Sequence, residues 1–134
     1  MKSRRLWFGL LAGLAATGGL GSAQEVVRAQ SPAPQGKAPA YYIAEFEVTD
    51  REGLRPYAEQ AESTFAPFGG RYIVRGGGAE PLEGNAPKSR LVIISFDSME
   101  QARAWYDSPA YVAIRPIRQR SGHTNAYIVE GLRN

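Results

Sequence analysis

The sequence contains no cysteine and only one histidine, and these absences remove several kinds of site. Without cysteine the chain has no disulfide, no thiolate metal site and no thiol-based redox chemistry. His123 has no His-x-x-His partner, so we expect no metal site and no cofactor; ligation of haem by His123 is the one alternative. The stability of the fold must therefore come from a packed core, with or without help from a partner subunit.

The chain also lacks a net charge once its N-terminal segment is set aside. It has 16 basic and 13 acidic residues, but Lys2, Arg4 and Arg5 belong to a segment of 23 residues that contains no acid. Thirteen residues of each sign remain beyond that segment. The basic balance of the whole chain is therefore no sign of nucleic-acid binding, and we expect none.

Residues 1–23 have the pattern of a secretory signal peptide. A basic start precedes an apolar run over residues 6–20, which is shorter than the roughly 20 residues of a membrane-spanning helix. Gly21-Ser22-Ala23 supplies the small residues of a cleavage site. The pattern predicts a periplasmic or secreted protein with no membrane attachment after cleavage. Ser3-Arg4-Arg5 also fits a twin-arginine signal, and retention of the segment as an anchor is the alternative to cleavage.

Residues 24–40 are rich in glutamine, alanine and proline and show no apolar periodicity, so they are interpreted as a flexible tether. The predicted folded domain spans residues 41–132. Alternating or continuous apolar runs predict strands at 41–48, 71–75, 90–96 and 124–130.

Helical spacing and capping residues place the helices between these strands. Thr49 and Glu52 form a capping box for the first helix, whose main part is expected to begin at Pro56. Ser98 caps the second helix, and Ser108-Pro109 ends it and starts a short further helix. The order is βαββαβ, the split βαβ arrangement of an α+β ferredoxin-like fold, with both helices on one face of a four-stranded antiparallel sheet.

The two faces of this sheet are expected to differ in composition. Apolar residues are assigned to the helix-covered face: Tyr42, Phe46, Tyr72, Val74, Ile94, Phe96, Tyr127 and Val129. The opposite face mixes apolar and polar residues: Ile43, Ile73, Leu91, Ile93, Ile128, Glu45, Glu47, Arg71, Arg75 and Ser95. Strict alternation in strand 71–75 puts both arginines on this second face. The face is too apolar to remain in water and too charged to be a core, which predicts a homodimer.

Several short sequence segments of this domain together form a recognisable family motif. They are Tyr42-Ile43-Ala44, Val48-Thr49-Asp50, Tyr57, residues 68–77, Leu82-Glu83-Gly84, Ser108-Pro109-Ala110-Tyr111 and Val129-Glu130-Gly131. Together they resemble the bacterial family called domain of unknown function 1330, over nearly the whole unit from Tyr41 to Gly131. The resemblance implies the dimeric α/β-barrel superfamily, whose ferredoxin-like sheets pair face to face. It implies no single activity, because that superfamily includes cofactor-independent oxygenases, haem-degrading enzymes, lactone isomerases and small-molecule binders.

Glu45, Arg71, Arg75 and Ser95 are the predicted ligand-binding residues, since paired arginines on one sheet face suit a carboxylate or another anion. The alternative is that both arginines form ion pairs with Glu45 and Glu47, or with their copies across a dimer. Glu45 and His123 are weaker candidates for a general acid or base. Gly76-Gly77-Gly78 is interpreted as a turn that needs positive φ, in preference to an anion-binding nest.

Three functions remain open at this point. The first is an exported homodimer that binds a small molecule in a pocket between the sheet and the partner subunit. The second is a cofactor-independent enzyme, of oxygenase or isomerase type, acting on a small aromatic or carbonyl compound in the same pocket. The third is a structural dimer without a ligand.

Overall fold

The computed structural model describes residues 36–87 and 89–133. The predicted signal peptide and residues 24–35 of the predicted tether lie outside the described residues, so export stays a prediction. The first strand begins at Ala40, one residue earlier than expected. Ala38 is already buried, and the Gly131 amide donates to the Pro39 carbonyl at 2.7 Å, so the end of the tether joins the folded domain.

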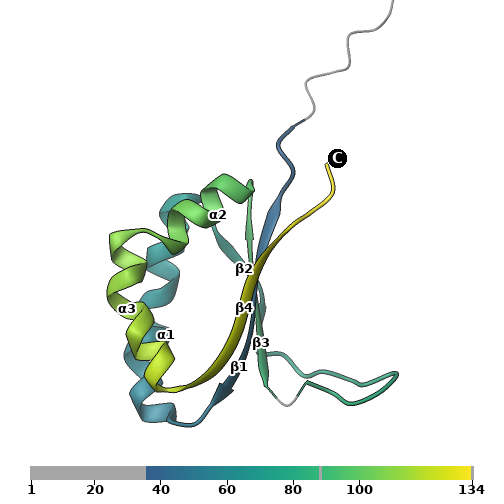
Figure 1. The fold of residues 1–134 in the computed structure, drawn as a ribbon, viewed down its shortest axis with the longest axis vertical. Helices are drawn as coiled ribbons and strands as arrows, with labels where there is room; N and C mark the ends of the chain where they lie inside the picture. The colour runs from purple at the N-terminus through teal and green to yellow at the C-terminus, as the bar shows by residue number, and fades with distance from the viewer. Residues whose placement is uncertain (1–35, 88, 134) are drawn as a thin grey trace, which may run out of the picture. The chain divides into compact units, whose positions relative to one another are not determined.

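The elements follow the order βαββααβ, with a short 3-10 turn after the first helix (Figure 1). Their bounds are β1 Ala40–Val48, α1 Arg51–Phe65, η1 Ala66–Phe68, β2 Arg71–Arg75, β3 Arg90–Phe96, α2 Met99–Tyr106, α3 Pro109–Arg120 and β4 Gly122–Glu130. Within residues 36–87 and 89–133, no helix is both long enough and apolar enough to cross a membrane. The predicted α+β, ferredoxin-like fold is confirmed.

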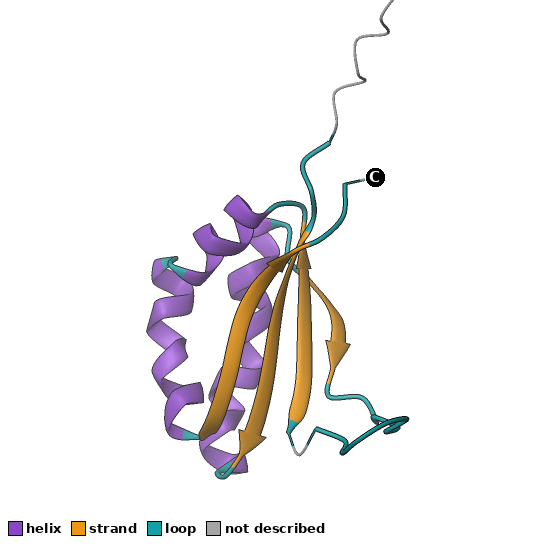
Figure 2. Cartoon of the chain, turned by 45° about the vertical axis from the view of Figure 1, so that its right-hand side comes forward, coloured by secondary structure: helices purple, strands orange, loops and turns teal. Residues whose placement is uncertain are grey.

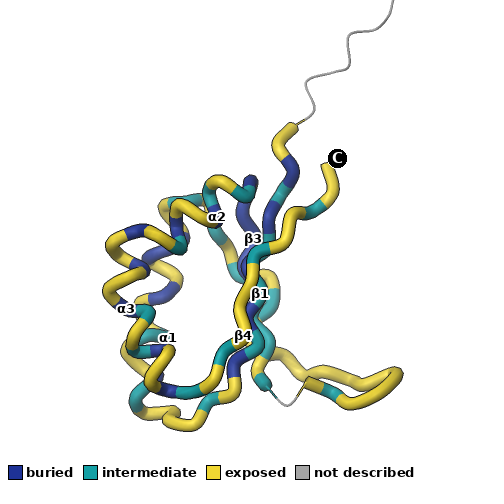
Figure 3. The backbone as a smooth tube through the Cα atoms, viewed as in Figure 1, coloured by how far each residue is buried: buried dark blue, intermediate teal, exposed yellow. Residues whose placement is uncertain are grey.

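The four strands form one antiparallel sheet in the order β2-β3-β1-β4, so the apolar β3 is central, as predicted. Helices α1, α2 and α3 form a layer on one side of this sheet, and among the described residues no helix covers the other side (Figure 2). The buried residues lie along the facing sides of the helices and the sheet (Figure 3). The loop between β2 and β3 projects on the side away from the helices (Figure 1).

An aromatic cluster fills the space between the two layers. Trp105 on α2 is fully buried, and its ring centroid lies 5.0 Å from that of Tyr42, 5.4 Å from that of Phe96 and 4.2 Å from that of Tyr111. Its indole N–H donates to Thr64 Oγ1 on α1 at 3.0 Å, so the one polar atom of the ring is satisfied. This cluster ties α1, α2 and α3 to the two central strands.

The helix starts confirm two predicted caps and correct a third. The Ser98 and Ser108 hydroxyls accept from the amides of Gln101 and Tyr111, as expected of N-caps. At α1 the cap is Asp50, whose carboxylate accepts from the Gly53 amide at 2.9 Å, and the Thr49 capping box was therefore wrong. Helix α1 also continues through Pro56 where a break was expected, at the cost of one intrahelical hydrogen bond.

A β-bulge in β2 separates the two arginines that alternation placed together. Arg71 is opposite Ser95 and Tyr72 is opposite Ile94, but the register then shifts, so that Arg75 is opposite Val92. The extra residue in the bulge reverses the alternation. Arg71 therefore lies on the open face, whereas Arg75 lies on the helix-covered face, and the prediction of a shared face was wrong. Val74 moves to the open face for the same reason.

The side chains of β4 face the opposite sides of the sheet from those predicted. Ile128 is opposite Tyr42 and packs against the core, whereas Tyr127 is opposite Ile43 and is 53% exposed. Val129 is exposed in the same way. Both alternating sets in β4 are apolar, so the sequence pattern did not distinguish the inner set from the outer one. The pairing with β1 decides it. The strand also begins at Gly122, so His123 lies within it.

We predict that Gly70→Ala destabilises the fold by about 1 to 3 kcal/mol, because a Cβ there overpacks the core. The added atom would lie 2.7 Å from Phe96 Cε1 and 2.9 Å from Phe65 Cδ2. The matched control is Gly77→Ala, which has no atom within 4 Å of the new methyl group and should leave stability nearly unchanged. Urea unfolding measures both variants, and equal stabilities would contradict the packing of Gly70 described above.

Candidate functional site

A cavity of about 90 Å³ lies between the helix layer and the sheet. Strands β1, β2 and β3 form one wall, and α1 and α3 form the other. The apolar part of the lining consists of Ala44, Phe46, Leu54, Ala58, Val92 and Ile94. The polar part consists of Tyr42, Tyr57, Tyr72, Arg75, Arg90 and Arg118. The lining contains no aspartate, glutamate or histidine, so its charge is wholly positive.

Arg118 is the residue that distinguishes this cavity from an ordinary packing defect. It lies near the end of α3, its side chain points inward, and only 5% of its surface is exposed. Its Nε atom has no hydrogen-bond partner, and no carboxylate of the described residues is within salt-bridge distance of it. Burying an arginine without a carboxylate partner is costly, and Arg118 lies directly beside the cavity.

Three phenol groups surround this guanidinium. The Tyr57 and Tyr111 hydroxyls are 3.2 Å apart, and the buried Tyr42 hydroxyl has no partner among the described residues. Burial raises the pKa of both Tyr42 and Tyr57 well above the usual value for tyrosine. Burial alone lowers the pKa of Arg118, but the phenol oxygens of Tyr42 and Tyr111 more than offset this, and the net shift is upward. At neutral pH Arg118 is therefore a cation beside the protonated hydroxyls of Tyr42 and Tyr57.

Two further arginines lie at the β2–β3 side of the cavity. Arg75 donates to the Ala58 carbonyl at 3.4 Å, and its guanidinium carbon lies 4.7 Å from the centre of the Tyr72 ring. The Arg90 side chain passes over Gly76, where a Cβ would lie within 3 Å of its aliphatic carbons. Gly76 also has a φ of 64°, which confirms the predicted positive-φ turn at this position.

The structure does not bring the four predicted ligand-binding residues together. Glu45, Arg71 and Ser95 lie on the open face, and Arg75 alone lies at the cavity. Arg71 approaches Asp97 at 3.6 Å, and among the described residues it forms no ion pair with Glu45 or with Glu47. Ser95 is buried between its neighbours in register, Tyr41 and Arg71. A ligand-binding role for the open-face residues stays a prediction.

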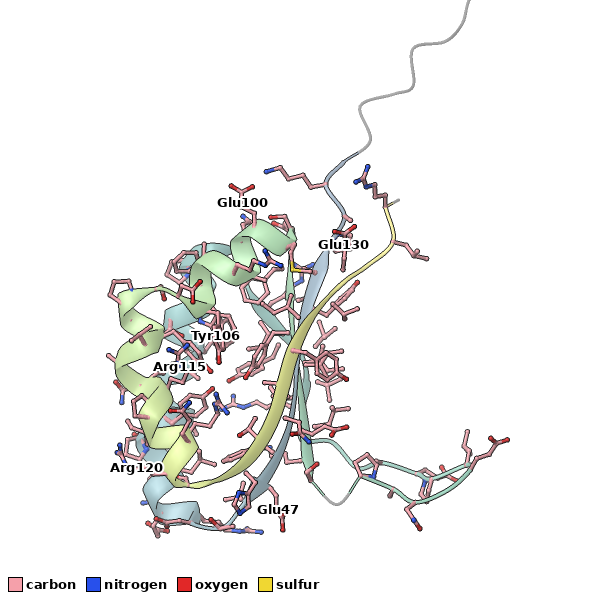
Figure 4. All side chains as sticks on the ribbon, in the orientation of Figure 1. Glu47, Glu100, Tyr106, Arg115, Arg120 and Glu130 are labelled. Atoms are coloured by element: carbon pink, nitrogen blue, oxygen red, sulfur yellow. The ribbon has the colours of Figure 1, made fainter. Side chains whose placement is uncertain are left out.

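The weaker catalytic candidates, Glu45 and His123, are not part of the lining of this cavity. His123 is opposite Glu47 across the β1–β4 pair, on the open face, and Glu45 is opposite Asn125. Figure 4 shows Glu47 near the end of the sheet. These residues share one surface at the beginning of β4. Arg118 also belongs to the lining of this surface depression, together with Glu45, Glu47 and His123. The roles of Glu45 and His123 as acid or base stay predictions.

Arg118 was missed in the sequence, although a signal for it exists. Tyr111, Ile114 and Arg118 have the spacing i, i+3, i+7, which places them on one face of a helix. In the sequence the apolar positions of this helix are Tyr111, Ile114 and Ile117, and the charged Arg118 is adjacent to the last of them. An arginine within an apolar helical stripe is the pattern that points to this site.

We predict a difference in alkaline stability between the wild type and Tyr42→Phe. The pKa of Tyr42 is raised above 10.0 in the fold, so above pH 10 the unfolded chain loses a proton that the native chain keeps. Its contribution to stability is complete below that pH and is lost as the pH rises. The free energy of unfolding of the wild type should therefore fall more steeply above pH 10, by up to about 1.4 kcal/mol per pH unit. Between pH 6 and 9 the gap between the two proteins should stay constant. Parallel curves above pH 10 would mean that the phenol is not buried.

The chain is similar in fold to several solved structures. A protein of unknown function from Rhodopseudomonas palustris matches with a TM-score of 0.59 and 15% identity, over 73% of this chain and 85% of that one. A cofactor-independent oxygenase from Streptomyces nogalater matches with a TM-score of 0.47 and 12% identity, over 72% of this chain and 96% of that one. A protein from Bacteroides fragilis, described as dimeric with a ferredoxin-like fold, matches with a TM-score of 0.45 and 16% identity, over 71% and 98%.

Comparison with curated proteins gives no match. The family model described as "Domain of unknown function (DUF1330)" matches residues 39–132, which is most of the chain and nearly all of the described domain. This agrees with the segments that carried the resemblance, from Tyr42-Ile43-Ala44 to Val129-Glu130-Gly131. The chain belongs to the DUF1330 family.

Proposed function

We propose that this protein is a homodimer that binds a small organic molecule in the cavity between the helices and the sheet of each subunit. The observation that carries the proposal is Arg118, a buried guanidinium that faces a cavity with no acidic group in its lining. A cavity lined mainly by apolar side chains with a few convergent polar groups is the usual form of a ligand site. This differs from the expected position of the pocket, which was between the sheet and the partner.

The cavity supplies positive charge and hydroxyl donors, but its lining has no carboxylate or imidazole that would act as a general base at neutral pH. Binding therefore has more support here than the enzymatic alternative. The wholly structural alternative leaves the Nε of Arg118 and the hydroxyl of Tyr42 without partners beside a cavity.

The homodimer rests on the open face of the sheet. Its apolar residues are neighbours in register: Ile43 lies between Ile93 and Tyr127. The remaining apolar residues of this face are Tyr41, Val74, Leu91 and Val129. Tyr127 and Val129 are 53% and 42% exposed, which is unusual for neighbouring large apolar residues on a monomer.

A second copy of the chain is the occupant that this face fits. Two such faces are self-complementary when they are related by a twofold axis, with the apolar centres in contact. Glu45, Glu47 and Arg71 supply both signs of charge on the same face. The β2–β3 loop also projects on this side, and it carries Leu82 at 89% exposure, an apolar side chain available to a facing subunit (Figure 1).

We predict that Val129→Glu weakens or abolishes the dimer, because it places a charge in the apolar contact. Light scattering at micromolar concentration measures the mass. The matched control is Val112→Glu on α3, where the valine is 41% exposed and lies on the helix layer. This control should keep the mass of two chains. A monomeric wild type, or equal behaviour of the two variants, would contradict the sheet-to-sheet dimer.

We predict that compounds found in a thermal-shift screen of the wild type will fail to stabilise Ala58→Met, whose longer side chain occupies the cavity. The screen should contain small acids, amides, phenols and alcohols at millimolar concentration. Ala113→Met is the control, because Ala113 is exposed on α3 and its longer side chain points to solvent. Shifts that survive in Ala58→Met would place the binding site elsewhere.

A further inference from the structure

We propose that the ligand of this cavity is a small organic carboxylate, which the Arg118 guanidinium binds directly while the Tyr42 hydroxyl donates to the same group. This rests on the proposed binding function and adds the chemical class of the ligand. Two buried polar groups at the cavity lack partners, the Nε of Arg118 and the hydroxyl of Tyr42.

The two unpartnered groups set the chemistry of what can satisfy them. Arginine has only donors, and a protonated phenol donates readily to an oxyanion. A carboxylate has only acceptors, and its two oxygens match the fork of a guanidinium. A neutral amide of the same shape would place its NH₂ group, which is a donor, against the Arg118 and Tyr42 donors. One of these two donors would then still lack an acceptor. The charge of Arg118 also has no counterion among the described residues, and a carboxylate would provide one.

The rest of the cavity restricts the body of this ligand. Ala44, Phe46, Leu54, Val92 and Ile94 line it with apolar surface. Its volume of about 90 Å³ is far below the roughly 300 to 1,000 Å³ of sites for drug-sized ligands. We therefore expect a branched aliphatic or single-ring acid. Larger acids and polar sugar acids do not suit these walls.

The two arginines at the β2–β3 side favour the approach of an anion. Arg75 and Arg90 line the same cavity, and neither forms an ion pair with a described carboxylate. On the adjoining surface Arg51 is also basic, Arg55 is paired with Glu52 at 3.1 Å, and Glu47 is the one acidic residue of that lining. Fixed positive charge around an opening raises the local concentration of anions and their rate of entry.

The test compares acids with their isosteric amides on the full mature dimer. The pairs are isobutyrate with isobutyramide and benzoate with benzamide, and inorganic phosphate is a separate arm. Titration calorimetry and Tm shifts should show that at least one acid binds at least tenfold more tightly than its amide, and that phosphate does not compete with it. Tighter binding of phosphate would overturn the carboxylate assignment, and equal binding of acid and amide would do the same.

Substitution of the arginine provides the second part of the test. Arg118→Met keeps much of the side-chain volume and should abolish the preference for acids, with at least a tenfold loss of affinity for them. Arg120→Met is the matched control, because Arg120 is exposed two residues later on α3, and it should bind acids within twofold of the wild type (Figure 4). If Arg118→Met does not fold, Arg118→Lys keeps the charge without the fork and should retain a reduced preference. An unchanged preference in the foldable variant would overturn the assignment.

The outcomes separate this inference from the function on which it rests. Amides or phenols that stabilise the wild type and lose their effect in Ala58→Met, while no acid binds, would leave the cavity as a binding site and refute the carboxylate. Failure of every class of compound to bind in the cavity would refute both.

Discussion

The packing of aromatic rings around Trp105 is the interaction on which the rest of this structure depends. The ring lies between Phe96 of β3 and Tyr111 of α3, and its N–H bonds to Thr64 of α1. Because one side chain contacts all of these elements, it sets the separation between the helix layer and the sheet. Rings of this size hold the layers farther apart than small aliphatic residues would.

The cavity follows from the same spacing. Arg118 lies seven residues beyond Tyr111 on α3, about 10 Å farther along the helix axis. Aromatic rings also line this region, but Ala44 and Ala58 are too small to fill the space between the layers here. Near the α2–α3 junction the Arg115 guanidinium covers the Tyr106 ring, with its central carbon 4.6 Å from the ring centre (Figure 4). The rings around Trp105 therefore fill the middle of the interlayer space, and the cavity lies toward the Arg118 end of α3.

The two faces of the sheet differ in what they contact. The helix-covered side carries the core and the buried arginine, and its polar groups are positioned by strands and helices that have little freedom to move. The open side carries apolar residues with charges among them, and the proposed occupant of this side is a second copy of the chain. This division explains why the expected site failed as a unit. The prediction placed its four residues on one face of the sheet. The bulge at Ile73 puts Arg71 on the open face and Arg75 on the helix-covered face.

The sequence by itself determined the elements, their order and therefore the fold class. The strands at 71–75 and 90–96 have the predicted bounds, and the caps at Ser98 and Ser108 start the helices that they predicted. These features are local, because alternation, helical period and capping depend on residues close together in the chain. Only the tertiary structure decided which way each strand faces. The bulge depends on how β2 pairs with β3, and the orientation of β4 depends on its register with β1. The helical spacing in the sequence indicates that Arg118 faces inward. The absence of a described carboxylate near its side chain depends on residues far apart in the sequence, which come together only when the helices pack on the sheet.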